Sequence, residues 1–230
     1  MNKERKEIFH GRHLIAKVGA LMFDRNLTDL AGGNISMRIG DKVLMSPSFA
    51  GTYHFWNIKP EDVLVLTMDG KKIDGKGEIS RESPMHLKLL NSFYPVAKAV
   101  IHAHPLYTQV FCASQQPIPP VLEGNMRYGL IKCAKFANGG SHSEELAENI
   151  YQAFEGQTKL IEEYAAAVLA PWHGIVCAGR DIYSVVDTIE RIDVNAHCIL
   201  LGQSLLPKNE WAQKAQLALI EAMGKSNSGE

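Results

Sequence analysis

Short apolar runs fill the middle of the chain, whereas apolar residues nearer its two ends repeat at helical spacing. The runs predict strands at 35–39, 43–45, 63–66, 99–102, 168–170 and 175–178, and an Asp-Gly pair at 69–70 indicates a hairpin. The helical spacing predicts helices over 8–22, 83–93, 146–154, 185–199 and 211–222, with a frayed tail at 225–230. Strands flanked by helices predict one layered α+β domain over residues 1–230.

Two helix starts carry recognisable capping signals. Ser83 followed by Pro84 predicts an N-cap with proline in the first turn. Ser141 and Glu144 have the spacing of a capping box. We therefore expect helices to begin at these two places.

The composition is that of an ordinary globular protein, with 46% hydrophobic and 21% charged residues. Its 24 basic and 25 acidic residues nearly cancel, so neither nucleic acid nor an anionic membrane is expected as a partner. The start of the chain is charged, and no run of about 18 apolar residues occurs. A cytoplasmic protein is expected, with free thiols at four cysteines that form no CxxC pair: Cys112, Cys133, Cys177 and Cys198.

Two histidines flank Ala103 at the end of the expected strand at 99–102. Alternate side chains of a strand share a face, so His102 and His104 would point the same way, about 6–7 Å apart along the backbone. Two imidazoles so placed can converge on one metal ion. The alternative, one buried and one surface histidine, is about as common for a bare pair of this kind.

A third histidine, His173, lies between two apolar runs and precedes Gly174. Taken alone, it is typical of a loop histidine. Together with the pair at 102 and 104 it completes a set of three, which is the number of protein ligands in catalytic zinc sites that keep a fourth position open.

Other polar residues have both a structural and a functional interpretation. Glu82 precedes a helix start, where a carboxylate is electrostatically favourable, but it could also be a metal ligand or a general base. The segments 31–36 and 46–48 could present N–H groups to an anion, or form ordinary tight turns. Arg81 could bind a phosphate or carboxylate, or be solvated.

In this order, the segments resemble the class II aldolase/adducin family, which includes fuculose-phosphate aldolase. The matching stretches are 32–36, 46–48, 60–64, 80–82 with His86, 102–105 and 173–174. The resemblance implies a three-layer α/β/α domain around a mainly antiparallel central sheet. It also implies a homotetramer with sites between subunits.

The resemblance also implies an enzyme and a set of residue roles. It makes His102, His104 and His173 ligands of a divalent metal, usually Zn²⁺, with Mn²⁺ or Co²⁺ as alternatives. Glu82 becomes the base that moves a proton. The phosphate pocket would be lined by Gly33, Asn34, Ser48 and Ser80, with Arg81 beside them. The implied reaction is cleavage of a ketose phosphate to dihydroxyacetone phosphate and an aldehyde through a metal-stabilised enediolate.

Three departures from fuculose-phosphate aldolase leave the substrate open. Phe49 follows Ser48 where that enzyme has glycine, and Arg81 replaces a second serine. Glu123 stands where that enzyme has its acid tyrosine, and Tyr128 nearby is given no role. A metal-dependent decarboxylase of a keto acid or sugar-acid phosphate is the alternative enzyme. A non-catalytic, adducin-like interaction module would be marked by broken metal ligands, and here the full set is present.

Overall fold

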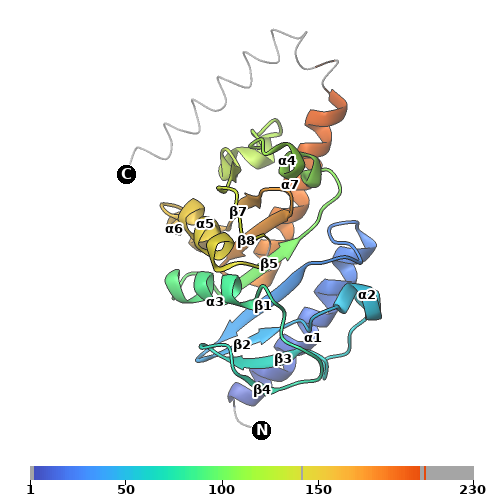
Figure 1. The fold of residues 1–230 in the computed structure, drawn as a ribbon, viewed down its shortest axis with the longest axis vertical. Coiled ribbons are helices and arrows are strands. Elements are labelled where there is room, and N and C mark those ends of the chain that lie inside the picture. Colours follow the sequence, from blue (N-terminus) through green and yellow to red (C-terminus); the bar gives the residue numbers. More distant parts are fainter. Residues whose placement is uncertain (1–2, 141, 203–204, 206–230) are drawn as a thin grey trace.

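A computed structural model describes residues 3–140, 142–202 and 205 of the chain. An eight-stranded sheet crosses this part of the protein in the order β4-β3-β2-β1-β5-β8-β7-β6 (Figure 1). Neighbouring strands are antiparallel except for the parallel pair β6 and β7. The strands are β1 (Asn34–Ile39), β2 (Lys42–Met45), β3 (Leu64–Thr67), β4 (Lys72–Asp74), β5 (Ala99–Ala103), β6 (Lys132–Cys133), β7 (Ala165–Ala170) and β8 (Gly174–Gly179).

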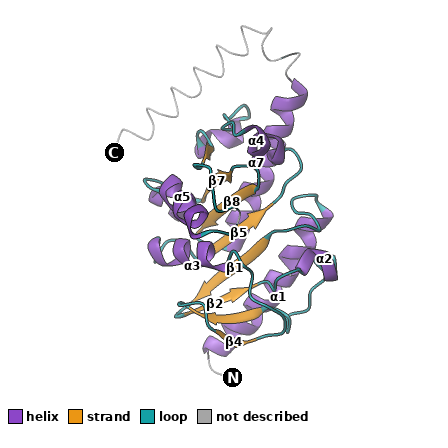
Figure 2. Ribbon diagram, viewed as in Figure 1, coloured by secondary structure: helices purple, strands orange, loops and turns teal. Residues whose placement is uncertain are grey.

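Helices cover both faces of this sheet (Figure 2). They are α1 (Lys3–Asp24), α2 (Ala50–His54), α3 (Ser83–Ser92), α4 (Thr108–Ser114), α5 (Glu144–Phe154), α6 (Thr158–Glu163) and α7 (Ile182–Gly202), with a 3₁₀ helix η1 (Glu123–Tyr128). Successive residues of β5 enter different cores, because side chains alternate across a strand. Ile101 packs in the core that contains α1 and α7, whereas Val100 packs in the core that contains α3 and α5. The expected three-layer arrangement with a mainly antiparallel sheet is confirmed.

The expected elements and the observed ones differ mainly at helix ends. Ser143, not Ser141, caps α5, and its hydroxyl accepts a hydrogen bond of 3.1 Å from the N–H of Leu146. Ser83 is the first residue of α3, so the N-cap position belongs to Glu82. The elements that the periodicity missed are short ones, such as α2, α4, α6, η1 and β6, because so few residues carry no readable repeat. The helix expected at 211–222 and the tail at 225–230 lie outside the described residues.

All four cysteines are free thiols, as expected. Burial raises the pKa of Cys112 to about 12 and also raises that of Cys177, so both stay protonated at neutral pH. Within the described residues, no helix combines the length and the apolar character that crossing a membrane requires.

Candidate metal centre

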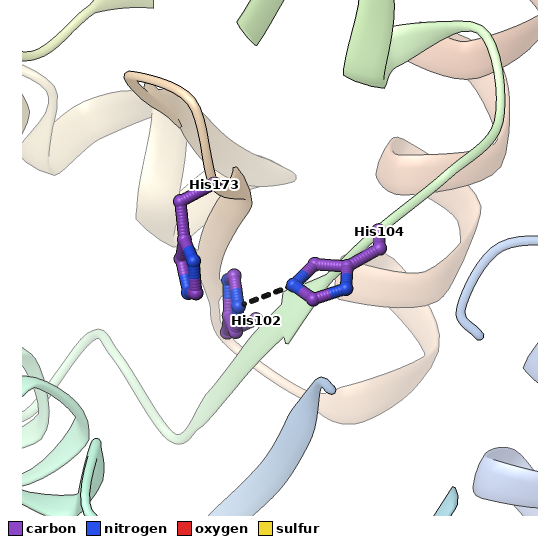
Figure 3. Close-up of side chains that lie close together, drawn as sticks. All are labelled: His102, His104 and His173. Carbon is purple, nitrogen blue, oxygen red and sulfur yellow. Dashed lines mark hydrogen bonds between the residues drawn. The ribbon is translucent and has the colours of Figure 1, made fainter. Parts of the chain in front are cut away.

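The end of β5 and the turn before β8 bring the three histidines together. β8 pairs antiparallel with β5, with His102 opposite Val176, so the β7–β8 turn lies beside the last residues of β5. His173 is in that turn, directly before β8. Its ring stacks on that of His102, with centroids 4.4 Å apart and planes 7° apart. One ring nitrogen from each of His102, His104 and His173 lies within 4.8 Å of the other two (Figure 3).

Neighbouring groups decide which nitrogen of His102 and of His104 is free. Nδ1 of His102 lies 3.1 Å from the carbonyl oxygen of Ile175, and Nδ1 of His104 lies 3.1 Å from Oδ1 of Asp29. Both partners only accept, so each Nδ1 carries the proton and each Nε2 presents a lone pair. The two Nε2 atoms are only 3.1 Å apart. Two lone pairs at this distance repel each other unless a proton or a metal cation lies between them, at the contact that Figure 3 marks with a dashed line.

The donor set therefore fits a divalent metal. Two nitrogens bound tetrahedrally to zinc at about 2.0–2.1 Å lie about 3.3–3.4 Å apart, close to the distance between these two Nε2 atoms. Burial lowers the pKa of His102 to about 3, and burial also lowers the pKa of His104. Both rings are therefore neutral at pH 7, which is the form that binds a metal.

Gly32 and Gly174 have no side chain, and this leaves room for the histidine rings. A Cβ at Gly174 would lie 2.4 Å from the carbonyl oxygen of Ala103 and 2.7 Å from the ring of His104. A Cβ at Gly32 would lie 2.5 Å from Cε1 of His104. The N–H of Gly32 also donates to the Asp29 oxygen that binds His104, at 3.0 Å. The glycine loop and the histidine pair are thus held as one unit.

A carboxylate lies beside the three imidazoles. Glu82, at the N-cap of α3, is 7% exposed, and its Oε1 lies 2.7 Å from Nε2 of His173. Its Oε2 lies 3.7 Å from Nε2 of His102 and accepts a 2.6 Å hydrogen bond from the amide of Asn34. Burial by itself raises the pKa of Glu82, but the neighbouring His102 and His173 and the hydrogen bond from Asn34 outweigh it and hold that pKa below its usual value. An ionised carboxylate next to a cation site can bind the metal or move a proton.

A family model described as "Class II Aldolase and Adducin N-terminal domain" matches residues 13–200. The chain belongs to the class II aldolase and adducin family. A relative in this family, a 5-deoxy-D-ribulose 1-phosphate aldolase of Bacillus thuringiensis serovar kurstaki, is 29% identical over 222 residues, which cover 94% of this chain and 95% of the relative. A 3-oxo-tetronate 4-phosphate decarboxylase of Haemophilus influenzae is 26% identical over 207 residues, or 84% of this chain and 90% of that protein.

A solved structure of an L-fuculose 1-phosphate aldolase has the same fold, with a TM-score of 0.72. It is 24% identical in sequence, and the match covers 84% of this chain and 86% of that one. Relatives in the class II aldolase family thus include both aldolases and a decarboxylase, and the family alone does not choose between these reactions.

The pocket beside Glu82 contains every residue that the family resemblance assigns to phosphate binding. Its lining includes Gly33, Asn34, Ser48, Ser80 and Arg81. Sequence reasoning missed three further groups at this site. Thr52 and His142 line the same pocket, and Asp29 binds His104. None of them stands in a motif, so only the folded chain reveals them.

The structure places the other two departures from fuculose-phosphate aldolase, at Phe49 and Glu123. Phe49 lines the pocket with a φ of 60°, a left-handed conformation that favours glycine. A non-glycine residue held in this conformation costs about 1 kcal/mol or more. Glu123 and Tyr128, in η1, are not among the described residues that line this pocket.

We expect a Gly32→Ala variant to lose metal affinity, because its methyl group displaces the ring of His104. Disturbing the groups that hold a metal ligand in place typically lowers the metal affinity about 10–100-fold. Gly40→Ala is the matched control, since a Cβ there meets no atom within 4 Å, although its φ of +58° makes it the more strained backbone. Metal titration of both variants checks this. Equal metal affinity in the two variants would contradict the expectation that a methyl group at position 32 displaces the ring of His104.

Proposed function

We propose that this chain is a metal-dependent aldolase that cleaves a ketose phosphate to dihydroxyacetone phosphate and an aldehyde. The observation that carries the proposal is the convergence of three imidazoles, two with facing lone pairs, beside a buried carboxylate in a polar pocket. The family membership and the aldolases among its relatives support the same reaction class.

The residues around this pocket have complementary tasks in the proposed reaction. His102, His104 and His173 would hold a divalent cation, which when bound would supply Lewis-acid stabilisation of negative charge on the substrate. Glu82 moves the proton. Proton transfer by a positioned side chain typically raises the reaction rate about 10²–10⁴-fold.

Substrate recognition falls to other residues that line the same pocket. Asn34 and the hydroxyl groups of Ser48 and Ser80 supply neutral polar contacts for the phosphate. The guanidinium of Arg81 adds a positive charge that can bind two of its oxygens at once.

We further propose zinc as the resident metal, with manganese or cobalt as alternatives, because three histidines and an open position are typical of catalytic zinc. A homotetramer is the proposed assembly, on the family resemblance, and a cytoplasmic location is proposed because the four cysteines suit a reducing compartment. Light scattering tests the assembly, and a monomer mass would contradict it.

A metal-dependent decarboxylase of a keto acid or sugar-acid phosphate is the second candidate. Arg81 in the pocket favours it, since a guanidinium matches a carboxylate as well as a phosphate. The decarboxylase among the relatives supports this candidate too. Loss of carbon dioxide requires no initial deprotonation, so Glu82 would then have a lesser part. A non-catalytic, adducin-like role is disfavoured because all three histidines and Glu82 are present and adjoining.

Product analysis distinguishes these functions. Purified protein reloaded with zinc is incubated with a panel of ketose 1-phosphates, including 5-deoxyribulose and fuculose 1-phosphates, and with 3-oxo-acid phosphates. We expect equal amounts of dihydroxyacetone phosphate and aldehyde, and no product after treatment with a chelator. Release of carbon dioxide without dihydroxyacetone phosphate would establish the decarboxylase instead. No turnover of any compound in either group would contradict both enzymes.

A further inference from the structure

His86 lies wholly inside the protein, between α3 and the sheet, and is 0% exposed. Four helical residues separate it from Glu82 by about 6 Å along α3. Two strand residues separate Asn34 from Ser36 by about 6.7 Å along β1. These similar spacings let the two side chains on α3 meet the two on β1. The β1–β5 register also places Asn34 opposite His102. The four side chains therefore lie next to the candidate metal site.

The four side chains form one buried line of hydrogen bonds. The hydroxyl of Ser36 lies 2.7 Å from Nδ1 of His86, and Nε2 of His86 contacts Oδ1 of Asn34. The amide nitrogen of Asn34 then lies 2.6 Å from Oε2 of Glu82 and 3.1 Å from the hydroxyl of Ser80. The line ends at the carboxylate that the proposed reaction uses.

The chemistry of these groups leaves one consistent arrangement of protons. An ionised Glu82 only accepts hydrogen bonds, so Asn34 must turn its NH₂ group toward it and its oxygen toward His86. Burial lowers the pKa of His86 to about 4, so the ring is neutral and has a single N–H. That N–H must be on Nε2, and Nδ1 must accept from the hydroxyl of Ser36.

We infer that His86 is a positioning residue for the reaction: its Nε2–H selects the amide orientation of Asn34 that donates to Glu82. This rests on the proposed function of Glu82. The hydroxyl of Ser80 can accept or donate, so it does not discriminate between the two amide orientations. Without the donor on His86, the amide can present its oxygen to the carboxylate, which repels and displaces the charged group.

Two substitutions separate the N–H donor from the bulk of the side chain. His86→Met removes the donor and fills similar space, whereas His86→Gln offers an amide N–H near the position of Nε2. We expect the kcat of the zinc-loaded methionine variant to fall about 10–100-fold, with its KM and metal content close to those of the wild type. The glutamine variant should recover most of this kcat. Equal kcat values for the methionine variant and the wild type would overturn the inference, as would a folded glutamine variant no better than methionine.

A substitution elsewhere on α3 controls for lost stability. Leu90 is 0% exposed and packs in the core that contains α3 and α5. Leu90→Ala should lower the melting temperature, because it leaves a cavity in that core, and leave the kcat of the folded, metal-loaded protein unchanged. If it lowers kcat as much as His86→Met does, the effect of His86 is merely structural and the inference fails.

The proton position can be read without any activity. In zinc-loaded wild-type protein labelled with ¹⁵N-histidine, long-range ¹H–¹⁵N spectra should show the His86 proton on Nε2 and an unprotonated Nδ1. A proton on Nδ1 would overturn the inference, even in an active aldolase. Conversely, the expected tautomer in a protein that cleaves no ketose phosphate would leave the hydrogen-bonded line intact and reject only the proposed function.

Discussion

A His104→Ala variant is expected to lose both its bound metal and its turnover while it keeps the fold. The substitution removes one of three nitrogens and also the side chain that contacts Asp29 and the glycine loop. Loss of a residue that only holds a metal ligand in place lowers the metal affinity about 10–100-fold. Loss of the ligand itself should therefore weaken metal binding by more than about 100-fold.

Elemental analysis and product assays check this prediction, with His13→Ala as the matched control. His13 is exposed on α1, outside the candidate site. The wild type and the control should each hold about one metal ion per chain after reloading, and the His104 variant far less. Circular dichroism should show the same helix content in all three proteins. A His104 variant with full metal content and full turnover would refute the metal site.

A Glu82→Gln variant is expected to keep its metal and lose about 10²–10⁴-fold in turnover, the usual contribution of a positioned general base. Glutamine has the same shape, and its amide oxygen can still accept the hydrogen bond from Asn34. The variant therefore removes the negative charge and the proton acceptor but not the packing. This separates the proposed role of Glu82 from that of the three histidines.

Turnover and metal content are measured together for this variant. Glu61→Gln, at an exposed position, controls for the change of charge. A variant that loses its metal along with its activity would make Glu82 a ligand rather than a base. A variant that still releases carbon dioxide at the wild-type rate would favour the decarboxylase, because that reaction requires no initial deprotonation.

Local patterns predicted much of the fold. The apolar residues at helical spacing from 8 to 22 lie in α1, and the apolar runs of the middle became strands of the sheet. The helix starts were less accurate, since Ser143 caps α5 and Glu82 occupies the N-cap position of α3. A cap is chosen by where the chain actually turns, and that depends on packing as well as on residue type.

Local patterns likewise predicted one part of the candidate site and not the rest. The two-residue period of a strand predicts that His102 and His104 share a face, although His104 follows the last residue of β5. Nothing local brings His173 to them, because that requires the antiparallel pairing of β5 with β8. The contacts of Asp29 with His104 and of His86 with Asn34 join residues 75 and 52 positions apart.

The sequence by itself therefore determined which elements form, which side chains share a face and which residues have metal-binding chemistry. These properties depend on neighbours a few positions away, where the period of a helix or strand is set by the backbone. Only the tertiary structure decided which of these residues meet and which nitrogen of His102 and of His104 is free. Strand register and helix packing are settled by the burial of the whole apolar surface, and no short segment contains that information.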